Sequence, residues 1–373
     1  MPSLPLRAGI CRGLLIALAW MLCALSGGAA DAPRAFPLWD GKETVESYAA
    51  RVAMPATKSI DLGGGVKLDL VLIPAGQFIM GSAEPAKPSA TETEAIGLIV
   101  FGGSMAAFLA LVLLIKCAKQ KKFSFSLRWL LLMTISIGLC VGGIARRSLA
   151  LKEAARYEGE LAEFKNLPSN EKPAHLVTIA EPFYMGKCTV TEIQCIWVIG
   201  YSLDAMKGDQ FPAVGILWDE ATEFCKKLNG KLNDKAFEVR LPTEAQWEYA
   251  CRAGTRTRFY SGENESDLDA VGWHRANSGG TRHPVGQKKP NSFGLYDMHG
   301  NVWEWCQDLL NDGSYSGTPS EAPDPPSYYA KHVLRGGDCI NEAIDCRSAR
   351  RAGRYFDDRV SNGGFRVVLN LKP

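Results

Sequence analysis

Two uncharged stretches in the middle of the chain constrain its fold more than any other feature. Residues 95–115 and 129–145 contain no charged side chain, and an apolar run of about 20 residues is long enough to cross a bilayer as a helix. Under the positive-inside rule, the basic connection between them is cytoplasmic. The sequence therefore predicts a transmembrane helical hairpin with both ends outside; the alternative is two buried core helices. The basic residues of the connection are Lys116, Lys119, Lys121, Lys122 and Arg128.

The first thirty residues have the pattern of a secretory signal peptide. Arg7 and Arg12 form a basic end, residues 13–25 are apolar, and small residues follow at 26–30. We therefore expect cleavage at the end of this region, and the alternative is an uncleaved membrane anchor. Residues 31–60 are then predicted to form a linker and a short helix.

Local patterns predict short strands and two well-marked helices. Residues 66–73 and 77–80 flank a Pro-Ala-Gly turn, which indicates a hairpin. Thr243 and Gln246 have the spacing of a capping box for a helix over 244–252. With 37 Gly and 20 Pro, the chain is rich in turns. Further predicted elements are a helix from Asp219 to a stop at Gly230 and strands at 176–179 and 183–185.

Composition limits the classes of function. The formal net charge is only +2 in 373 residues, which gives no support for nucleic-acid binding. No two cysteines form a CxxC pair, so a zinc site is a poor interpretation. In an oxidising compartment some cysteines should pair, and an odd number outside the signal and the membrane hairpin leaves at least one unpaired. These are Cys188, Cys195, Cys225, Cys251, Cys306, Cys339 and Cys346.

A loop at residues 291–308 is the leading candidate for a functional site. Gly300 permits a turn with positive φ between two acids, Asp297 and Glu304. Carboxylates and free backbone carbonyls are the ligands that Ca²⁺ prefers, so the loop is a plausible calcium site. The alternative is that the tryptophans of the loop are core anchors and its acids are only solvated.

Four segments together resemble the formylglycine-generating enzyme family, the sulfatase-modifying factors. They are GLYDMHGNVWEW within residues 291–308, RLPTEAQWEYACRAG at 240–254, RGGDC with CRSARR at 335–351, and GFRVV at 364–368. They occur in the family's order, and the likeness covers about 70–80 and then 173 to the C-terminus. The resemblance implies an irregular α+β fold of the C-type-lectin-like, sulfatase-modifying-factor kind, with bound calcium.

Matched position by position, the resemblance implies which residues hold calcium. The side chains of Asp297 and Glu304 and the backbone carbonyls of Gly300 and Val302 correspond to one ligand set. Asn277 corresponds to a ligand of another calcium site, although its acidic partner is missing and the loop that follows it is shortened. Calcium at the first set is therefore expected to stabilise the loop.

The resemblance also implies a copper site, and here the sequence departs from the family. The family's enzyme holds Cu(I) between two thiolates and oxidises a substrate cysteine to formylglycine with molecular oxygen. Cys346 matches one of these ligands, but Asn341 stands at the other, and an amide is a hard donor that cannot replace a thiolate. Asp338 and Glu342 replace an uncharged serine and histidine of the family and add negative charge. The family's residues Trp303 and Asn362 are retained.

Cys346 has more than one interpretation. It could form a disulfide with Cys251 or Cys306. Alternatively, Cys339 lies two residues before Asn341, and a shift of the loop would let it complete a thiolate pair with Cys346. The first interpretation excludes oxidase chemistry, whereas the second would restore a pair of soft ligands suited to Cu(I).

The position of the uncharged runs implies that one domain is split by an insertion. Family-like strands occur before and after it, so we predict a domain of residues 61–90 and 171–373. Residues 91–170 form the inserted membrane hairpin, followed by a charged, helix-prone stalk at 148–167. Because a hairpin returns to its starting side, both halves of the domain stay in one compartment, and loop insertions cost little entropy for their length.

Two hypotheses about function follow for this membrane-anchored, extracytoplasmic chain. The first is a calcium-stabilised binding module or divergent family member that contacts its ligand through Asp338, Asn341 and Trp303, next to Asn362. The second is an active copper-dependent oxidase that converts a sulfatase cysteine to formylglycine. The expected partners are the membrane and a sulfatase, another exported protein or a glycan.

Overall fold

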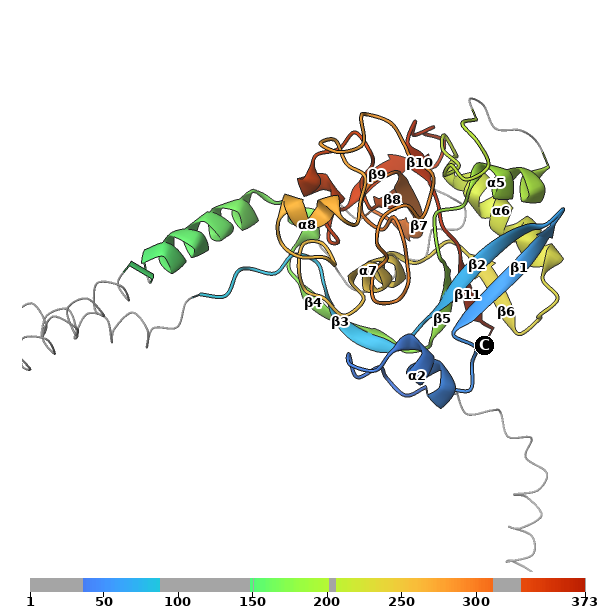
Figure 1. Cartoon of the computed structure of the whole chain (residues 1–373), viewed down its shortest axis with the longest axis horizontal. Coiled ribbons are helices and arrows are strands. Elements are labelled where there is room, and N and C mark those ends of the chain that lie inside the picture. Colours follow the sequence, from blue (N-terminus) through green and yellow to red (C-terminus); the bar gives the residue numbers. More distant parts are fainter. Residues whose placement is uncertain (1–35, 88–147, 150, 201–205, 311–329, 373) are drawn as a thin grey trace, which may run out of the picture.

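The structure is a computed structural model that describes residues 36–87, 148–149, 151–200, 206–310 and 330–372 (Figure 1). The predicted signal peptide, the two predicted membrane spans and residues 311–329 lie outside these ranges. Within the described ranges, no helix is both long and apolar enough to cross a membrane. The inserted membrane hairpin therefore stays a prediction.

Three small sheets form the framework of the molecule. Five strands pair antiparallel in the order β1-β2-β5-β11-β6, four pair in the order β10-β7-β8-β9, and β3 pairs with β4. Among the strands that the structure describes, only β10 and β7 pair in parallel. The bounds are β1 Thr57–Gly63, β2 Val66–Ile73, β3 Gly76–Met80, β4 His175–Ile179, β5 Phe183–Gly186, β6 Phe237–Arg240, β7 Trp303–Leu309, β8 Lys331–Arg335, β9 Ala352–Tyr355, β10 Gly363–Gly364 and β11 Val368–Leu371.

Short helices cover the sheets. Helix α7 lies between the β3–β4 pair and the sheet that contains β7 and β8, and α5 packs against α6 (Figure 1). The predicted capping box is confirmed, because Thr243 and Gln246 exchange side-chain and backbone hydrogen bonds at the start of α7. The bounds are α2 Val45–Arg51, α5 Glu192–Ile199, α6 Trp218–Lys231, α7 Glu244–Arg252 and α8 Glu265–Asp269, with 3-10 turns η1 Ser169–Glu171 and η2 Ala343–Cys346.

Helix α6 begins and ends differently from the prediction. It starts at Trp218, where the Glu220 side chain accepts the Leu217 N–H at 2.9 Å, so Asp219 is not the cap. Gly230 lies inside the last turn and does not stop the helix. The apolar face was placed correctly, since Phe224 and Leu228 are fully buried. The periodicity of apolar residues located the helix. Its first turn is set by Glu220, one residue after the predicted cap Asp219.

The predicted hairpin of residues 66–80 is wrong in its pairing. Both strands exist, but β2 pairs with β1 and β5, and β3 pairs with β4. The true hairpin is β1–β2, because Gly63, Gly64 and Gly65 all have positive φ and can turn the chain where other residues would be strained. Local alternation predicted the strands, but the choice of partner depends on segments far away in sequence.

Strands from both sides of the insertion pair with each other. Met80 of β3 lies opposite His175 of β4, and Ile73 of β2 lies opposite Phe183 of β5. The described chain before residue 88 and after residue 147 therefore contributes neighbouring strands to the same sheets. The two flanks of the insertion meet in one folded unit.

The N-terminal segment belongs to this unit and is not a free linker. The predicted short helix is present as α2, where Tyr48 is fully buried and its hydroxyl accepts the Ala75 N–H at 3.1 Å. Strand β1 begins at Thr57, inside the region predicted as linker. The burial of an aromatic side chain explains why this segment is held against the domain.

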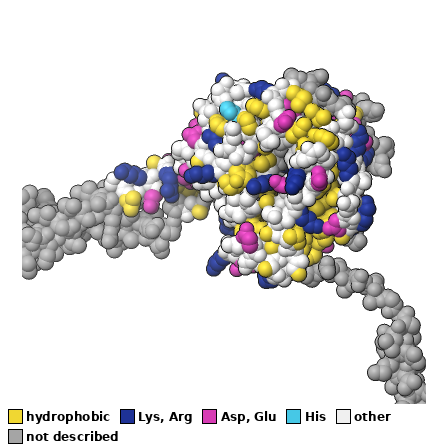
Figure 2. Space-filling model, turned by 45° about the vertical axis from the view of Figure 1, so that its right-hand side comes forward, with side chains coloured by type: hydrophobic (Ala, Val, Ile, Leu, Met, Phe, Trp, Pro, Cys, Tyr) yellow, Lys and Arg dark blue, Asp and Glu magenta, His cyan; other side chains and the backbone are white. Residues whose placement is uncertain are grey.

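The predicted stalk contains a helix over residues 151–166 that projects from the body (Figures 1 and 2). Most of its side chains are exposed. Its end is fixed to the domain, because Arg258 forms a two-point ion pair with Glu163 at 2.6 and 2.8 Å. Lys172 donates to the Phe164 carbonyl at 3.1 Å, which satisfies a carbonyl of the last helical turn.

Buried ion pairs tie the sheets to α7. Glu248 is fully buried and accepts hydrogen bonds from Arg252 and Gly81, and it also pairs with Arg335. Burial alone would raise the pKa of Glu248, but the two arginines and the Gly81 N–H outweigh it and hold this pKa at about 2, below the ordinary 4.5. The ionised carboxylate therefore stabilises the fold fully above pH 4.5, and this stabilisation is lost as the pH falls toward 2.

We expect Glu248→Gln to lower the free energy of unfolding by about 3–5 kcal/mol at pH 7, because two buried guanidinium groups lose their carboxylate. The loss should shrink at pH 3, where the wild-type pair is already weakened. Urea denaturation at both pH values measures this difference. Glu223→Gln, at an exposed site on α6, should change the free energy by less than about 0.5 kcal/mol. An equal loss for Glu248→Gln at both pH values would contradict the charge-based account.

Candidate functional site

The loop that follows β8 contains three of the predicted site residues, Asp338, Asn341 and Cys346. Gly337 has a φ of +76°, and a Cβ added there would lie 2.7 Å from the Cys346 sulfur and 2.9 Å from the Asp345 carbonyl oxygen. Only glycine allows the two ends of the loop to approach this closely. The loop therefore folds back on itself and places its first residues against Cys346.

Asp338, Asn341, Asn362 and Trp303 come together, as the resemblance implied. The Asn341 side-chain oxygen accepts the Asp338 N–H at 3.0 Å. The Asp338 carboxylate accepts the Ile340 N–H at 3.0 Å and the Asn362 amide at 3.2 Å. The Asn362 carbonyl accepts the Trp303 N–H at 2.9 Å, which joins this cluster to the start of β7. The result is a polar cluster built around one acid.

Burial shapes the charge of this cluster. Asp338 is only 5% exposed. Burial raises the pKa of its carboxyl, and hydrogen bonds from Ile340, Asn362 and Asn341 partly offset that rise. The surroundings of Asp338 therefore disfavour the ionised carboxylate relative to a solvated one.

Cys346 lies beneath the cluster and is held through its backbone. It is fully buried, and its sulfur is 4.0 Å from the Asp338 carbonyl oxygen. His299 Nε2 accepts the Tyr260 N–H at 3.1 Å, so Nδ1 must carry the proton and donate to the Cys346 carbonyl at 2.8 Å. Burial lowers the pKa of His299 to about 3, so the ring is neutral and fixes Cys346 without adding charge.

Neither thiol of the loop is disposed to ionise. Burial raises the pKa of Cys346 well above its ordinary value, and the acids Asp338 and Asp345 raise it further. Burial and the charge of Asp338 also raise the pKa of Cys339 to about 11. Because the thiolate is the nucleophile and the soft metal ligand, these surroundings oppose both roles at neutral pH.

The interpretation of Cys346 as half of a disulfide is wrong. Cys346, Cys251 and Cys306 are all free, as is every cysteine in the described part of the chain. The Cys251 sulfur instead lies 3.8 Å from His299 Nε2 and 3.9 Å from the Met298 carbonyl oxygen. Buried thiols pack here as small apolar groups, so spacing in the sequence gave no reliable guide to pairing.

The copper pair of the family does not fit the residues at its two positions. Cys346 is present, but the Asn341 side-chain oxygen is already bonded to the backbone of the same loop. Within the described ranges, no cluster of three or more histidine, cysteine or acidic side chains could hold a metal ion. Cys339, 1% exposed, is the nearest alternative thiol in the loop.

The side chains of two residues predicted to hold calcium, Glu304 and Asp297, already have hydrogen-bond partners. Both Glu304 oxygens are bonded to Arg366, at 2.6 and 2.7 Å, and also accept hydrogen bonds from Trp247 and Thr189. Asp297 has one oxygen bonded to the Gly286 N–H at 2.7 Å and one buried oxygen without a partner. One carboxylate oxygen of Asp297 is therefore available to a cation. Calcium binding here stays a prediction.

The Gly300 carbonyl and the Asn277 side chain have structural contacts of their own. The Gly300 carbonyl accepts the Val302 N–H at 2.9 Å within a tight turn. The Asn277 side-chain oxygen accepts the His274 N–H at 2.9 Å, and its amide donates to Asp269 and to the Gly272 carbonyl. Asn277 thus organises its own loop, and its oxygen is already in use.

Sequence reasoning missed two residues that shape this region. No motif in the sequence singled out His299, yet its ring holds Cys346 in place. Arg366 was treated only as part of the GFRVV segment, yet it is fully buried and neutralises Glu304. An arginine within an apolar strand-like run should signal a buried acid elsewhere, because a buried charge requires a partner.

The family follows from the fold, the site and the sequence together. Residues 152–371, more than half of the chain, match the sulfatase-modifying factor enzyme 1-like domain. The chain therefore belongs to this family. The mixed α/β architecture and the buried tryptophan-rich strand β7 are consistent with it.

Several relatives differ in what their names say. The chain is 36% identical to a formylglycine-generating enzyme of Streptomyces coelicolor over 42% of this chain and 52% of that one. It is 27% identical to the mouse formylglycine-generating enzyme over 82% and 76%. It is also 27% identical to the chaperone protein LppX of Paenibacillus barcinonensis over 48% and 80%. The chain thus spans about half the length of the Streptomyces enzyme.

Two solved structures have a similar fold. One is the Treponema denticola variable protein 1, with a TM-score of 0.55 and 21% identity over 86% of this chain and 100% of that chain. The other is PvdO from Pseudomonas aeruginosa, with a TM-score of 0.54 and 22% identity over 84% and 98%. At these identities the likeness concerns the fold alone.

Asp297 gives a direct test of the calcium prediction. Burial raises the pKa of its carboxyl to about 6, although the Gly286 N–H and Arg366 oppose that rise. The ionised form is therefore costly, and this cost is absent at low pH and grows as the pH rises through 6. We expect Asp297→Asn to raise the free energy of unfolding by about 2–3 kcal/mol at pH 8, and by less than about 1 kcal/mol at pH 4.5.

The same variant separates the two interpretations when calcium is added. Without calcium binding, millimolar calcium leaves the thermal midpoint of wild type unchanged at pH 8, and Asp297→Asn remains the more stable protein. A calcium-dependent rise in wild type that Asp297→Asn abolishes would establish Asp297 as a ligand. Asp209→Asn, at an exposed position, serves as the matched control.

Proposed function

We propose that this chain is a divergent, non-oxidising member of its family that binds polypeptide segments at the Asp338 cluster. The observation that carries the proposal is the hydrogen bond between the Asn341 amide oxygen and the Asp338 N–H at 3.0 Å. The Asn341 side chain that makes this bond stands where the family's enzyme needs a second soft ligand. A binding site needs only a shaped polar surface, which the cluster supplies.

The electrostatics of the loop support binding over copper chemistry. A copper-holding pair needs thiolates, whereas burial and the acids Asp338 and Asp345 raise the pKa of the Cys346 thiol. The neutral ring of His299 adds no positive charge that would counter them. The change to Asp338 relative to the family thus acts against ionisation of the Cys346 sulfur.

The surface of the loop favours a polypeptide over a glycan. Ile340 and Ile344 are 52% and 41% exposed and flank the polar cluster. Exposed isoleucines beside hydrogen-bonding amides suit a peptide, which offers both apolar side chains and backbone groups. The name of the relative LppX, a chaperone protein, supports a role in contacting other polypeptides.

Copper-dependent conversion of a sulfatase cysteine to formylglycine is the second candidate. It is favoured by Cys339, which is buried in the same loop as Cys346, and by the identity to formylglycine-generating enzymes. It requires Cys339 to take over the ligand position that Asn341 vacates. The loop would then have to open the Asp338–Asn341 hydrogen bond.

A sulfatase-derived cysteine peptide, supplied with Cu(I) and oxygen, tests the two candidates. We expect the peptide to bind and its cysteine to remain unchanged by mass spectrometry. Wild type should bind Cu(I) weakly, while Asn341→Cys should bind it more tightly by at least about a hundredfold, because a second soft ligand is restored. A chelator-competition titration measures the affinity.

The controls for this experiment are built into the same position. Asn341→Ser changes the side chain without adding a thiol and should leave Cu(I) affinity low. Asn341→Cys combined with Cys346→Ala should lose the gained affinity. Tight Cu(I) binding by wild type that requires both Cys339 and Cys346, together with conversion of the peptide, would overturn the non-oxidising proposal.

We further propose that the chain is anchored in the cell membrane by the predicted two-span hairpin, with its domain outside the cytoplasm. The pairing of β3 with β4 supports this arrangement, since an insertion that leaves and re-enters one sheet edge must return to its starting side. A hairpin of two spans meets that requirement.

Replacing residues 95–145 with a short Gly/Ser linker tests the anchor. We expect the altered protein to move from the membrane fraction to the soluble fraction and to keep its thermal midpoint within a few degrees, because loop length affects stability only weakly. Fractionation and a thermal melt provide the two measurements. Recovery of the shortened protein in the membrane fraction would contradict the proposal.

A further inference from the structure

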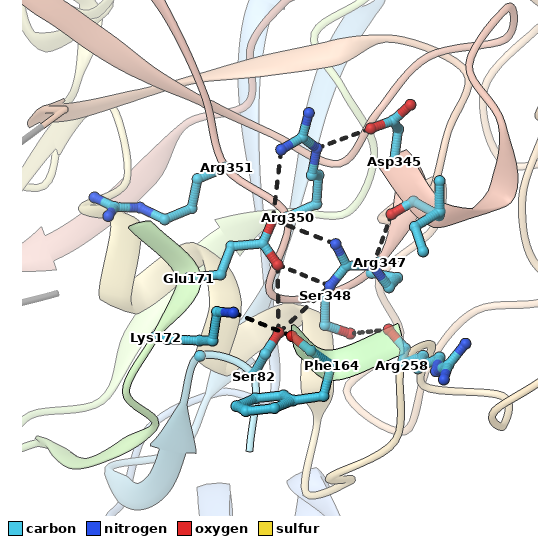
Figure 3. Close-up of polar contacts among 12 residues, drawn as sticks. Ser82, Phe164, Glu171, Lys172, Arg258, Asp345, Arg347, Ser348, Arg350 and Arg351 are labelled. Carbon is cyan, nitrogen blue, oxygen red and sulfur yellow. Dashed lines mark hydrogen bonds and ion pairs between the residues drawn. The ribbon is translucent and has the colours of Figure 1, made fainter. Parts of the chain in front are cut away.

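The two ends of the insertion meet at a buried polar cluster that also holds the candidate site loop. Ser82 precedes the insertion and Glu171 follows it, and the Ser82 N–H donates to the Glu171 carbonyl at 2.9 Å. Figure 3 shows Arg347 and Arg350 converging on the Glu171 carboxylate. We call Ser82, Glu171, Arg347 and Arg350 the clasp.

Glu171 is the centre of the clasp. Its side chain is fully buried and accepts from Arg347 at 2.8 and 3.3 Å. Arg350 approaches the same carboxylate at 3.4 Å, and the Ser82 hydroxyl at 3.3 Å. Arg347 is itself only 4% exposed, so neither charge can be hydrated if the other is removed. The geometry of the arginines therefore depends on this one carboxylate.

The arginines of the clasp belong to the segment that carries Cys346. Arg347 follows Cys346 directly, and its Nε donates to the Ile344 carbonyl at 2.7 Å. Arg350 also pairs with Asp345 at 2.9 Å, the residue just before Cys346 (Figure 3). The clasp thus fixes the backbone on both sides of the Cys346 sulfur.

A second contact joins the same segment to the stalk. Ser348 donates through its N–H at 2.8 Å and its hydroxyl at 3.0 Å to the Arg258 carbonyl (Figure 3). The Arg258 side chain in turn forms the two-point pair with Glu163 at the end of helix 151–166. The returning end of the insertion therefore contacts the site loop through two routes, one fully buried and one half-exposed.

We propose that Glu171 is a positioning residue for the candidate site. The segment that returns from the insertion holds Glu171 against the loop 338–346. The described segment from Glu163 to Glu171 is then joined to the site as well as to the domain. When Glu171 is in place, Cys346 stays buried and Asp338 keeps its contacts. When the carboxylate is lost, the Arg347 guanidinium has to move toward water. The backbone at Cys346 then moves with it. The identity of the loop as a binding site rests on the proposed function.

Thiol labelling of the full chain tests this inference without any ligand. A maleimide applied at pH 7.5, with the modified peptides quantified by mass spectrometry, reports how often each buried cysteine opens to solvent. We expect Glu171→Gln to raise the labelling rate of Cys346 by at least about tenfold, which corresponds to about 1.4 kcal/mol. Cys225, buried on α6 in a different part of the core, should keep its wild-type rate.

The matched control is Glu160→Gln, which removes an exposed carboxylate on the stalk helix and should leave every rate unchanged. Should Glu171→Gln fail to fold, Arg350→Gln removes only the outer pair and should raise Cys346 labelling by about threefold. An unchanged Cys346 rate, or a rise shared equally by Cys225, would overturn the inference. Because the readout involves neither peptide nor copper, it can fail or succeed independently of the proposed function.

Discussion

Buried arginine–carboxylate pairs are the interaction on which the rest of this structure depends. The strands are short, and the pairs join segments that hydrophobic packing alone would leave free to shift. Arg366, just before β11, forms an ion pair with Glu304 of β7. Both side chains are almost fully buried. Because each partner is costly to bury alone, a displaced register would leave an unpaired charge, so the pairs favour one arrangement over its near alternatives.

The same principle explains how the domain tolerates a long insertion. Loop closure becomes only slightly less favourable as an insertion lengthens, so the difficulty lies in fixing its ends. Here the ends are fixed by the β3–β4 ladder and by Glu171, whose carboxylate is held by Arg347. A ladder fixes the direction of the chain, and a buried ion pair fixes its position. Together they keep one core intact on both sides of the insertion.

The sequence predicted what is local and what the family pattern carries. The capping box at Thr243 depends on two residues three positions apart, and the structure confirms it. The grouping of Asp338 with Asn362 also followed from the family pattern. Strand partners and charge partners could not be predicted in this way. Glu304 pairs with Arg366, and β3 pairs with β4, although the partners are far apart in the sequence. Neither pairing therefore leaves a local signal.

The raised pKa of Cys346 and the fixing of the chain at Glu171 involve the same arginines. An arginine beside a thiol would lower the pKa of that thiol and favour the ionised form. In this chain Arg347 and Arg350, which follow Cys346, are directed to Glu171 and Asp345 instead. The sulfur is then left among acids, which raise its pKa. The ion pairs that fix the chain at Glu171 thus keep the arginine charges from the Cys346 sulfur. Oxidative chemistry would need positive charge at that sulfur.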